Sequence, residues 1–197
     1  MAVVALVVWV LYVSLATVRP LVMSRLRTGD WGFRPSTGVD AMVAALFPLA
    51  YAPLFIGSVL DLAGSVDRVA PLVGPVPQAI GIVLAIGGLP LIVLAQETMG
   101  RSWRIGVDPG ERTDLVTAGV FRWIRNPIYS CMILMAIGIS LLVPNALTLA
   151  GLALILVAAE LQARVVEEPH LLATHGGSYR RYAAASGRFV PGVGRLQ

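Results

Sequence analysis

The longest uncharged stretch of the chain limits its fold more than any other feature. From Pro127 to Ala159, 33 residues contain no Asp, Glu, Lys, Arg or His. Pro144-Asn145 divides this stretch into two apolar halves, and each half is too long for an ordinary strand and long enough for a helix. The pattern predicts a helical hairpin inside a membrane. A hairpin returns to the side it left, so its two polar ends are expected to lie together.

The composition of the whole chain agrees with a membrane setting. Its 197 residues are 57% apolar and only 13% charged, and the mean hydropathy is +0.79. Soluble domains carry about 25% charged residues, so this chain cannot cover a water-facing surface. The single cysteine, Cys131, excludes an internal disulfide. We therefore expect an all-α integral membrane protein rather than a disordered, disulfide-rich or ordinary cytosolic one.

Three apolar segments precede the hairpin. Residues 1–18 carry no charged side chain and no basic residue comes before them, so we expect a transmembrane helix rather than a cleaved signal peptide. Ala41–Leu60 and Val76–Ala95 are the second and third spans and complete a three-helix region over 1–95. Residues 96–197 form the remainder of what we expect to be one structural domain.

The two hairpin arms raise the expected number of transmembrane helices to about five, followed by a helical tail. The first arm, Ile128–Val143, is about 24 Å long at 1.5 Å per residue. A hydrocarbon core is about 30 Å thick, so this arm either crosses a locally thinned bilayer or is re-entrant. In the tail, we expect a break at Gly176-Gly177, with Ser178 capping the restarted helix.

Arginine supplies all 15 basic residues, and their distribution predicts the orientation. They gather after the first span, before the hairpin and in the tail, whereas the Asp61–Pro75 connector has only one. Cytoplasmic loops are enriched in basic residues. We therefore expect both hairpin ends at the cytosolic face of the inner membrane, with the amino terminus outside. No arginine cluster is interleaved with aromatic residues, so a nucleic-acid partner is not expected.

The carboxyl end of the hairpin carries a row of charges. Glu160, Arg164 and Glu168 are spaced four residues apart, so on an α-helix all three lie along one face. Ionisable groups at membrane depth are candidates for function. An ion-paired helix end among lipid headgroups explains the same row, and the spacing alone leaves both interpretations open.

The amino end of the hairpin has the pattern of a helix start beside arginine. Pro127 suits the first helical turn, where its missing N–H is harmless, and Asn126 precedes it as the expected cap. Free backbone N–H groups at such a start, together with Arg125, can receive an anion. A capped helix with outward-reaching arginines accounts for the same residues.

Taken together, the two ends predict a site for a ligand with both charges. Glu167 or Glu168 suits an ammonium or sulfonium group, and Tyr129 and Trp103 offer aromatic faces to a cation. S-adenosylmethionine, an amino acid and a lipid headgroup all satisfy this description.

Six motifs surround the uncharged hairpin in order and cover roughly residues 96–191, about half of the chain. They are Gly100-Arg101-Ser102-Trp103, Leu115-Val116-Thr117-x-Gly119-x-Phe121-Arg122, Arg125-Asn126-Pro127-Ile128-Tyr129, Arg164-x-x-Glu167-Glu168-x-x-Leu171, Gly176-x-x-Tyr179-x-x-Tyr182 and Arg188-Phe189-x-Pro191. The ordered set resembles the isoprenylcysteine carboxyl methyltransferase family, within the wider group of membrane methyltransferases that includes phospholipid N-methyltransferases.

This resemblance implies an S-adenosylmethionine cofactor and names the residues that hold it. The implied cofactor-binding residues are Arg125, Pro127, Tyr129, Glu167 and Glu168, with Trp103, Val116 and Gly119 nearby. Asn126 stands where the family usually has His. Asparagine can still position a ligand through hydrogen bonds, but it cannot titrate near neutral pH.

The resemblance also implies methyl transfer to a lipophilic acceptor, either an isoprenylcysteine-like carboxylate or another lipid. Arg164 is expected to steer an anionic substrate group, and Glu168 or Glu167 to act as base for an amine acceptor. A carboxylate acceptor needs no base. No metal is expected, because the two histidines, His170 and His175, lie in the tail without further ligands.

Two other functions share some of these features. Membrane sterol reductases have a similar Arg-His-Pro-x-Tyr element and bind NADPH, but Glu167-Glu168 after Arg164 favours the methyltransferase branch. A small transporter or binding protein is the non-enzymatic alternative. Transporters commonly show internal repeats, and we find none in this chain.

Overall fold

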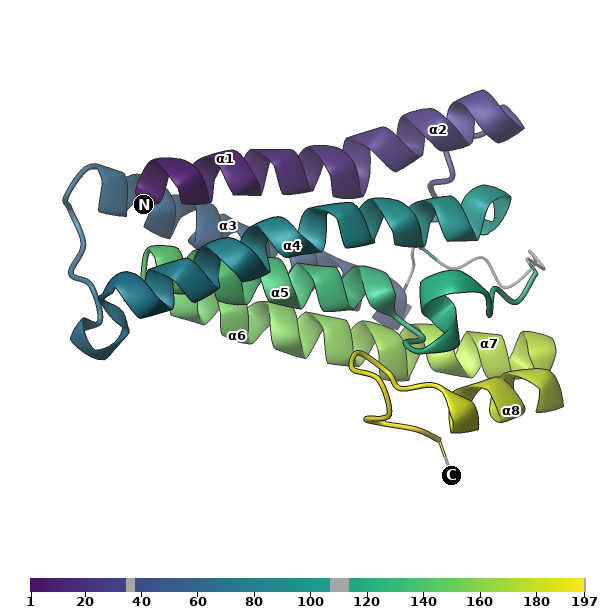
Figure 1. Ribbon diagram of the computed structural model, residues 1–197. Coiled ribbons are helices and arrows are strands. Elements are labelled where there is room, and N and C mark those ends of the chain that lie inside the picture. The colour runs from purple at the N-terminus through teal and green to yellow at the C-terminus, as the bar shows by residue number, and fades with distance from the viewer. Residues whose placement is uncertain (35–37, 107–113, 197) are drawn as a thin grey trace.

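The computed structural model describes residues 1–34, 38–106 and 114–196. Within these ranges the chain is helical and contains no β-strand, only isolated bridges that join Phe33 to Ile105 and Ile124 to Gly187. The long helices lie side by side, and shorter helices gather at one end of the bundle (Figure 1). The predicted all-α class is confirmed.

The first helix is longer than the sequence pattern predicts. α1 (Ala2–Val13), the π-helical turn η1 (Ser14–Val18) and α2 (Arg19–Thr28) form one continuous helix. The helix predicted from residues 1–18 therefore continues through Arg19-Pro20 to Thr28. Pro20 cannot donate a helical hydrogen bond, and the π-turn just before it accommodates that loss without ending the helix. The helix ends instead at Gly29, whose φ of 76° stops it in the left-handed region.

The second and third spans are confirmed, with longer bounds. α3 (Gly38–Leu62) and α4 (Pro75–Met99) each have 25 residues, and α4 runs into the 3₁₀ turn η3 (Gly100–Ser102). Prolines lie inside both helices, as membrane helices tolerate where neighbours satisfy the freed backbone groups. The connector between them contains the short turn η2 (Ala70–Leu72).

The hairpin is confirmed. After the short turn η4 (Gly119–Arg122), α5 (Pro127–Leu142) and α6 (Ala146–Leu161) are joined by a tight turn at Pro144-Asn145. Asn145 Oδ1 accepts from the backbone N–H of Leu147 and Thr148, both at 3.1 Å, and Thr148 Oγ1 accepts from the Asn145 N–H at 3.2 Å. This reciprocal cap gives hydrogen-bond partners to the backbone N–H groups at the start of α6. Membrane lipid could not satisfy these groups.

The second arm continues past the hairpin. The π-helical turn η5 (Gln162–Glu167) and α7 (Glu168–His175) extend α6 into one helix of 30 residues, Ala146–His175. α8 (Gly177–Ala185) then turns back beside α7 (Figure 1). Gly176, with a φ of 52°, occupies the cap position, so the prediction that Ser178 caps α8 is wrong. The chain reversal needs a positive φ, which glycine adopts without strain.

Small residues bring the helices into close contact. At the α4–α5 interface, a Cβ added to Gly138 would lie 2.6 Å from Ala85 Cβ and 2.7 Å from the Gly81 carbonyl oxygen. Across α3 and α6, a Cβ added to Gly151 would lie 2.7 Å from Leu54. Such contacts are typical of membrane helix interfaces, where dispersion forces replace the hydrophobic effect.

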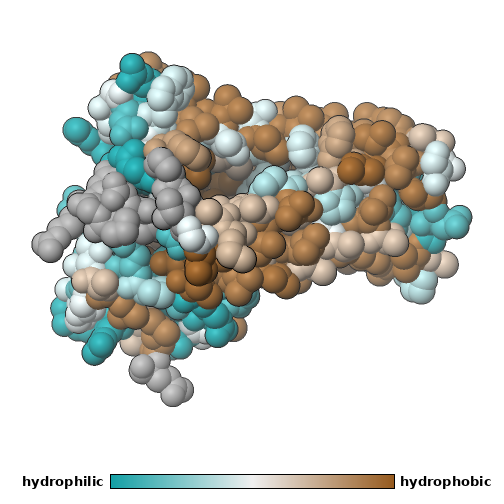
Figure 2. Space-filling model, turned by 180° about the vertical axis from the view of Figure 1, so that it is seen from behind, coloured by the Kyte–Doolittle hydropathy of each residue, from teal (hydrophilic) through white to brown (hydrophobic). Residues whose placement is uncertain are grey.

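The surface is that of a membrane protein. Within the described ranges, four helices are long and apolar enough to cross a bilayer, namely Ala2–Thr28, Gly38–Leu62, Pro75–Ser102 and Ala146–His175. The 16 residues of α5 form a fifth, shorter apolar helix. Apolar side chains cover the length of the bundle, and hydrophilic ones gather at its ends (Figure 2). The chain is a multi-pass membrane protein.

Candidate functional site

The two polar ends of the hairpin meet at Tyr129 and Glu167. Tyr129 lies in the first turn of α5, and Glu167 ends the π-turn η5. The Tyr129 hydroxyl donates a hydrogen bond to Glu167 Oε1. Both residues are half-buried. The prediction that folding the uncharged stretch brings these two residues together is therefore confirmed.

Two further aromatic rings surround Tyr129. Phe47 of α3 stacks on it with ring centroids 5.8 Å apart, and Phe189 of the tail meets it edge-on at 6.5 Å. Three separate parts of the chain thus enclose one carboxylate-bonded phenol. Aromatic faces beside a carboxylate form an environment that attracts a cation. Sequence analysis missed Phe47, since no pattern in the second span distinguishes it from other apolar residues.

Beside this pair lies a buried cluster of opposite charges. Glu168 accepts hydrogen bonds from Arg125 Nη2 at 3.0 Å and from Arg188 Nε and Nη2 at 2.8 and 3.0 Å. All three side chains are less than a tenth exposed. The hydrogen bonds to Glu168 raise the pKa of the Arg188 guanidinium above its ordinary value. Buried charges persist in a protein only when paired in this way.

The tail folds back onto the start of α5 and is held there by Arg125. Arg125 Nη1 donates to the carbonyls of Ala183 (2.9 Å) and Ser186, and Nη2 donates to the Gly194 carbonyl (2.8 Å) as well as to Glu168. Of its five N–H donors, only that on Nε has no partner among the described residues, and it is buried. The guanidinium therefore links the hairpin to the tail and keeps one donor unused.

Asn126 occupies the predicted cap position of α5, and Pro127 the first helical residue. The Asn126 side chain, however, does not cap the helix. Its Nδ2 donates to the Arg188 carbonyl at 3.4 Å, and its backbone N–H donates to the same oxygen at 3.1 Å. Asn126 thus binds the tail segment that contains Arg188.

The predicted row of three charges includes the π-turn η5. The two acids of this row share a partner, since Glu160 lies 3.7 Å from Arg188 Nη1 and Glu168 accepts from Arg188 Nε. Arg164 Nε pairs with Glu160 at 2.5 Å and is exposed, whereas Glu168 turns inward to the buried arginines. Pro169, which cannot donate to the preceding turn, follows the π-turn just as Pro20 follows η1.

A comparison with known sequences identifies the family of the chain. The model of the phospholipid methyltransferase family matches residues 76–177, from α4 to the first residue of α8. The chain belongs to the phospholipid methyltransferase family. The match contains Tyr129, Glu167, Arg125 and Glu168, whereas Arg188 and Phe189 lie beyond it. No curated protein sequence matches the chain significantly.

The fold of this family member also resembles a solved structure. That structure is the eukaryotic intramembrane Ras methyltransferase ICMT, isoprenylcysteine carboxyl methyltransferase, without a monobody. The similarity covers 94% of this chain and 67% of that one, with a TM-score of 0.59 and 21% sequence identity. The shared feature is the arrangement of membrane helices.

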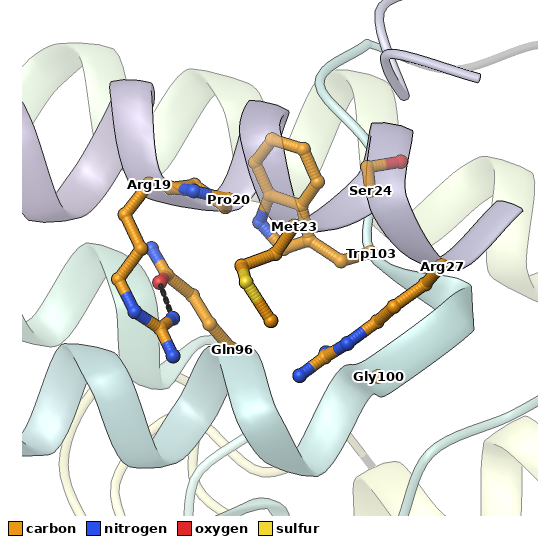
Figure 3. Close-up of a pocket in the computed structure, with 8 residues that line it drawn as sticks. All are labelled: Arg19, Pro20, Met23, Ser24, Arg27, Gln96, Gly100 and Trp103. Atoms are coloured by element: carbon orange, nitrogen blue, oxygen red, sulfur yellow. Dashed lines mark hydrogen bonds between the residues drawn. The ribbon is translucent and has the colours of Figure 1, made fainter. Parts of the chain in front are cut away.

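For three residues expected near the cofactor, namely Trp103, Val116 and Gly119, no hydrogen bond or ring contact with Tyr129 or Glu167 is found among the described residues. Trp103 is buried in a small pocket between α2 and the end of α4, with Arg19, Met23 and Gln96 among the lining residues (Figure 3). Arg19 Nη1 donates to Gln96 Oε1 at 3.0 Å across this pocket. α2 reaches Trp103 only because the first helix continues past Pro20.

Gly119 and Val116 lie in the segment that leads to η4. Gly119 has a φ of 57°, and a Cβ added to it would lie 3.1 Å from the Thr98 side chain at the end of α4. Val116 is half-buried. Among the described residues no group of three or more His, Cys, Asp or Glu side chains is placed to hold a metal ion.

Proposed function

We propose that this member of the phospholipid methyltransferase family uses S-adenosylmethionine to methylate a lipophilic acceptor at the cytosolic face of the membrane. The observation that carries the proposal is the Tyr129–Glu167 pair, enclosed by Phe47 and Phe189, at the polar end of the hairpin. Tyr129 and Glu167 lie inside the segment that matches the family, whereas Phe47 and Phe189 lie outside it.

The residues present fit both charged ends of this cofactor. A carboxylate and three aromatic rings suit its ammonium or sulfonium group. The unpartnered Nε–H of Arg125 and the first turn of α5 suit its carboxylate. An unused buried donor is unfavourable by itself, and an anion placed beside it removes that penalty.

When bound, the cofactor supplies a methyl group already activated on a sulfonium sulfur. The task of the chain is then to align the acceptor atom with that methyl group and to exclude water. The methyl group passes to the acceptor with its bond to sulfur broken, and the sulfur is left as a neutral thioether. For an amine acceptor, Glu167 is placed to receive the released proton, whereas a carboxylate acceptor releases none.

The proposal gives the remaining charged residues supporting roles. Glu168 is held by two guanidinium groups, so we assign it to positioning the α5 start and the tail. Arg164 is exposed where the hairpin meets the polar end, and it is proposed to steer an anionic group of the substrate. Arg125, Asn126 and Pro127 fix the helix start from which Tyr129 projects.

The cytosolic assignment rests on the arginines. The ends of α2 and α4 lie at the same end of the bundle as α7 and α8 (Figure 1). Arg19 and Arg27 both pair there with Glu97. Basic residues concentrate on the cytoplasmic side of membrane proteins.

The test is a labelling experiment on the purified protein in detergent. The enzyme is incubated with methyl-labelled S-adenosylmethionine and a total lipid extract of its host, and labelled products are identified by mass spectrometry. A thermal-shift series compares S-adenosylmethionine with NADPH. We expect a labelled lipid and stabilisation by S-adenosylmethionine alone. Stabilisation by NADPH alone, or no labelled product from folded protein, would overturn the proposal.

A further inference from the structure

The loop that follows α8 carries exposed apolar side chains. Val190 and Val193 of this loop, and Trp123 of the segment before α5, are each more than half exposed. Gly187 connects them, because its backbone N–H donates to the Trp123 carbonyl at 3.0 Å and a Cβ added to it would clash with the Val190 carbonyl oxygen. The Val193 N–H in turn donates to the Val190 carbonyl at 3.1 Å. We call Trp123, Val190 and Val193 the tail patch.

Contacts of the loop with the hairpin place it where the apolar part of the bundle ends. Arg188 Nη1 lies 3.7 Å from Glu160 Oε2, and Glu160 is the first charged residue after the 33-residue uncharged stretch. Ser130 Oγ, in the first turn of α5, donates to the Phe189 carbonyl at 2.7 Å. After α8 the chain turns back beside the end of α6 (Figure 1). The tail patch therefore lies at the level of the lipid headgroups, where tryptophan is enriched in membrane proteins.

Positive charge gathers beside the tail patch. The Arg122 guanidinium lies over the Trp123 ring, 5.5 Å from its centroid. Arg195 is exposed, and a Cβ added to Gly192, between the two valines in sequence, would lie 3.7 Å from its Nη2. Neither arginine forms an ion pair with an acid in the part of the chain that the structure describes. Both charges are therefore available to an external anion.

We propose that the tail patch, together with Arg122 and Arg195, is a binding surface for anionic phospholipids in the leaflet at the polar end of the bundle. The apolar side chains enter the headgroup boundary, and the two guanidinium groups contact lipid phosphates. An anionic leaflet attracts arginine within a Debye length, so the apolar and the charged contacts act at the same depth. The inference does not depend on methyl transfer.

This surface also affects the candidate site. The loop that carries the tail patch contains Phe189, whose ring meets Tyr129 edge-on at 6.5 Å. Lipid bound to the loop therefore holds one wall of the aromatic enclosure in place. Anionic lipid is thus expected to order this part of the site as well as the loop.

The experiment measures how deeply the loop lies in the full chain, reconstituted in phosphatidylcholine nanodiscs with increasing fractions of phosphatidylglycerol. A fluorescent dye is attached to Pro191→Cys, an exposed loop position outside the tail patch, while the native Cys131 is buried and stays unlabelled. Quenching by lipid spin-labelled near the headgroup reports contact with the boundary. We expect phosphatidylglycerol to raise the quenching at least about twofold. The same dye on Ser65→Cys, in the connector after α3, should not respond.

Arginine variants test the charge contribution. Replacing both Arg122 and Arg195 by Gln should raise the phosphatidylglycerol fraction needed for half-maximal quenching by about fivefold or more. Arg101→Gln removes another exposed arginine, in the turn after α4, and should leave that fraction unchanged. All of these side chains are exposed, so the fold should survive, and circular dichroism checks it.

Four results would overturn the inference. They are quenching of the wild-type loop that ignores phosphatidylglycerol, a double variant that responds as the wild type does, and the same change produced by inorganic phosphate in pure phosphatidylcholine discs. The fourth is a signal that follows the number of chains in each disc, which would indicate contact between copies of the chain instead of lipid binding.

Discussion

Glu167 and Glu168 are neighbours in sequence, yet they have opposite surroundings. Glu167 accepts from a neutral phenol and faces aromatic rings, whereas Glu168 accepts from two buried guanidinium groups. Adjacent side chains on a helix do not share a face, so the two carboxylates meet different partners. One is therefore available to a ligand, and the other holds the hairpin and the tail together.

The burial of Glu168 between two arginines predicts that removing its charge costs far more stability than removing the charge of an exposed acid. Glu168→Gln leaves Arg125 and Arg188 buried without their counter-charge and should lower the free energy of unfolding by about 3–5 kcal/mol. Asp67→Asn, at an exposed position in the connector after α3, should cost less than about 1 kcal/mol. Denaturant titrations in mixed micelles, followed by circular dichroism, measure both. Equal losses in the two variants would contradict a structural role for the buried cluster.

Some of this residue-level detail was within reach of the sequence. The charge-free run begins at Pro127, just before Tyr129, and ends at Ala159, one helix segment before Glu167, so the hairpin brings the two residues to the same end. The partners of Arg125 were not predictable, because they are backbone carbonyls of a tail that is remote in sequence. Arg188 belongs to the tail motif Arg188-Phe189-x-Pro191, but its pairing with Glu168 depends on how the tail folds back and has no signal in the sequence.

At the scale of elements, close packing of small residues defines the α4–α5 interface. Gly138 has no room for a Cβ, which would contact Ala85 at 2.6 Å, whereas a Cβ on Gly87 of α4 meets nothing within 4 Å. The sequence shows both glycines in apolar helices and cannot say which one faces a neighbour. The structure distinguishes them, since only the interface position is filled by another backbone.

The two glycines therefore respond differently to alanine. Gly138→Ala should destabilise the protein by about 1–3 kcal/mol through overpacking. Gly87→Ala should be neutral or stabilise by up to about 1 kcal/mol, because alanine is the better helix former. Thermal unfolding of the two variants in one detergent makes the comparison. A loss of stability in Gly87→Ala as large as that in Gly138→Ala would show that the interface is misplaced.

At the scale of the whole molecule, the arginines predict which end faces the cytoplasm. Ser65 lies in the connector after α3, and Ser178 lies in α8 at the opposite, arginine-rich end. Both are exposed, and the native Cys131 is buried. In intact cells, a membrane-impermeant maleimide should label Ser65→Cys and should reach Ser178→Cys only after permeabilisation. The reverse pattern would place the proposed site on the outer face.

The number and order of spans followed from hydropathy, but their ends did not. Each apolar run predicted a helix, and four of the five helices extend past the predicted residues into polar sequence. Pro20 and Pro169 both stand two residues after a π-turn, and the helix continues through them. Proline is common at helix ends as well as after such turns, so the sequence alone does not distinguish a helix that stops from one that continues.

The most direct test of the central claim is the affinity of the Tyr129–Glu167 site for the demethylated cofactor. Isothermal titration with S-adenosylhomocysteine should show binding by the wild-type chain, and about 10- to 100-fold weaker binding by Glu167→Gln. Glutamine still accepts from Tyr129, so the fold should survive. Asp114→Asn, an exposed carboxylate at the same end, should bind as the wild type does. Wild-type affinity in folded Glu167→Gln would contradict the account.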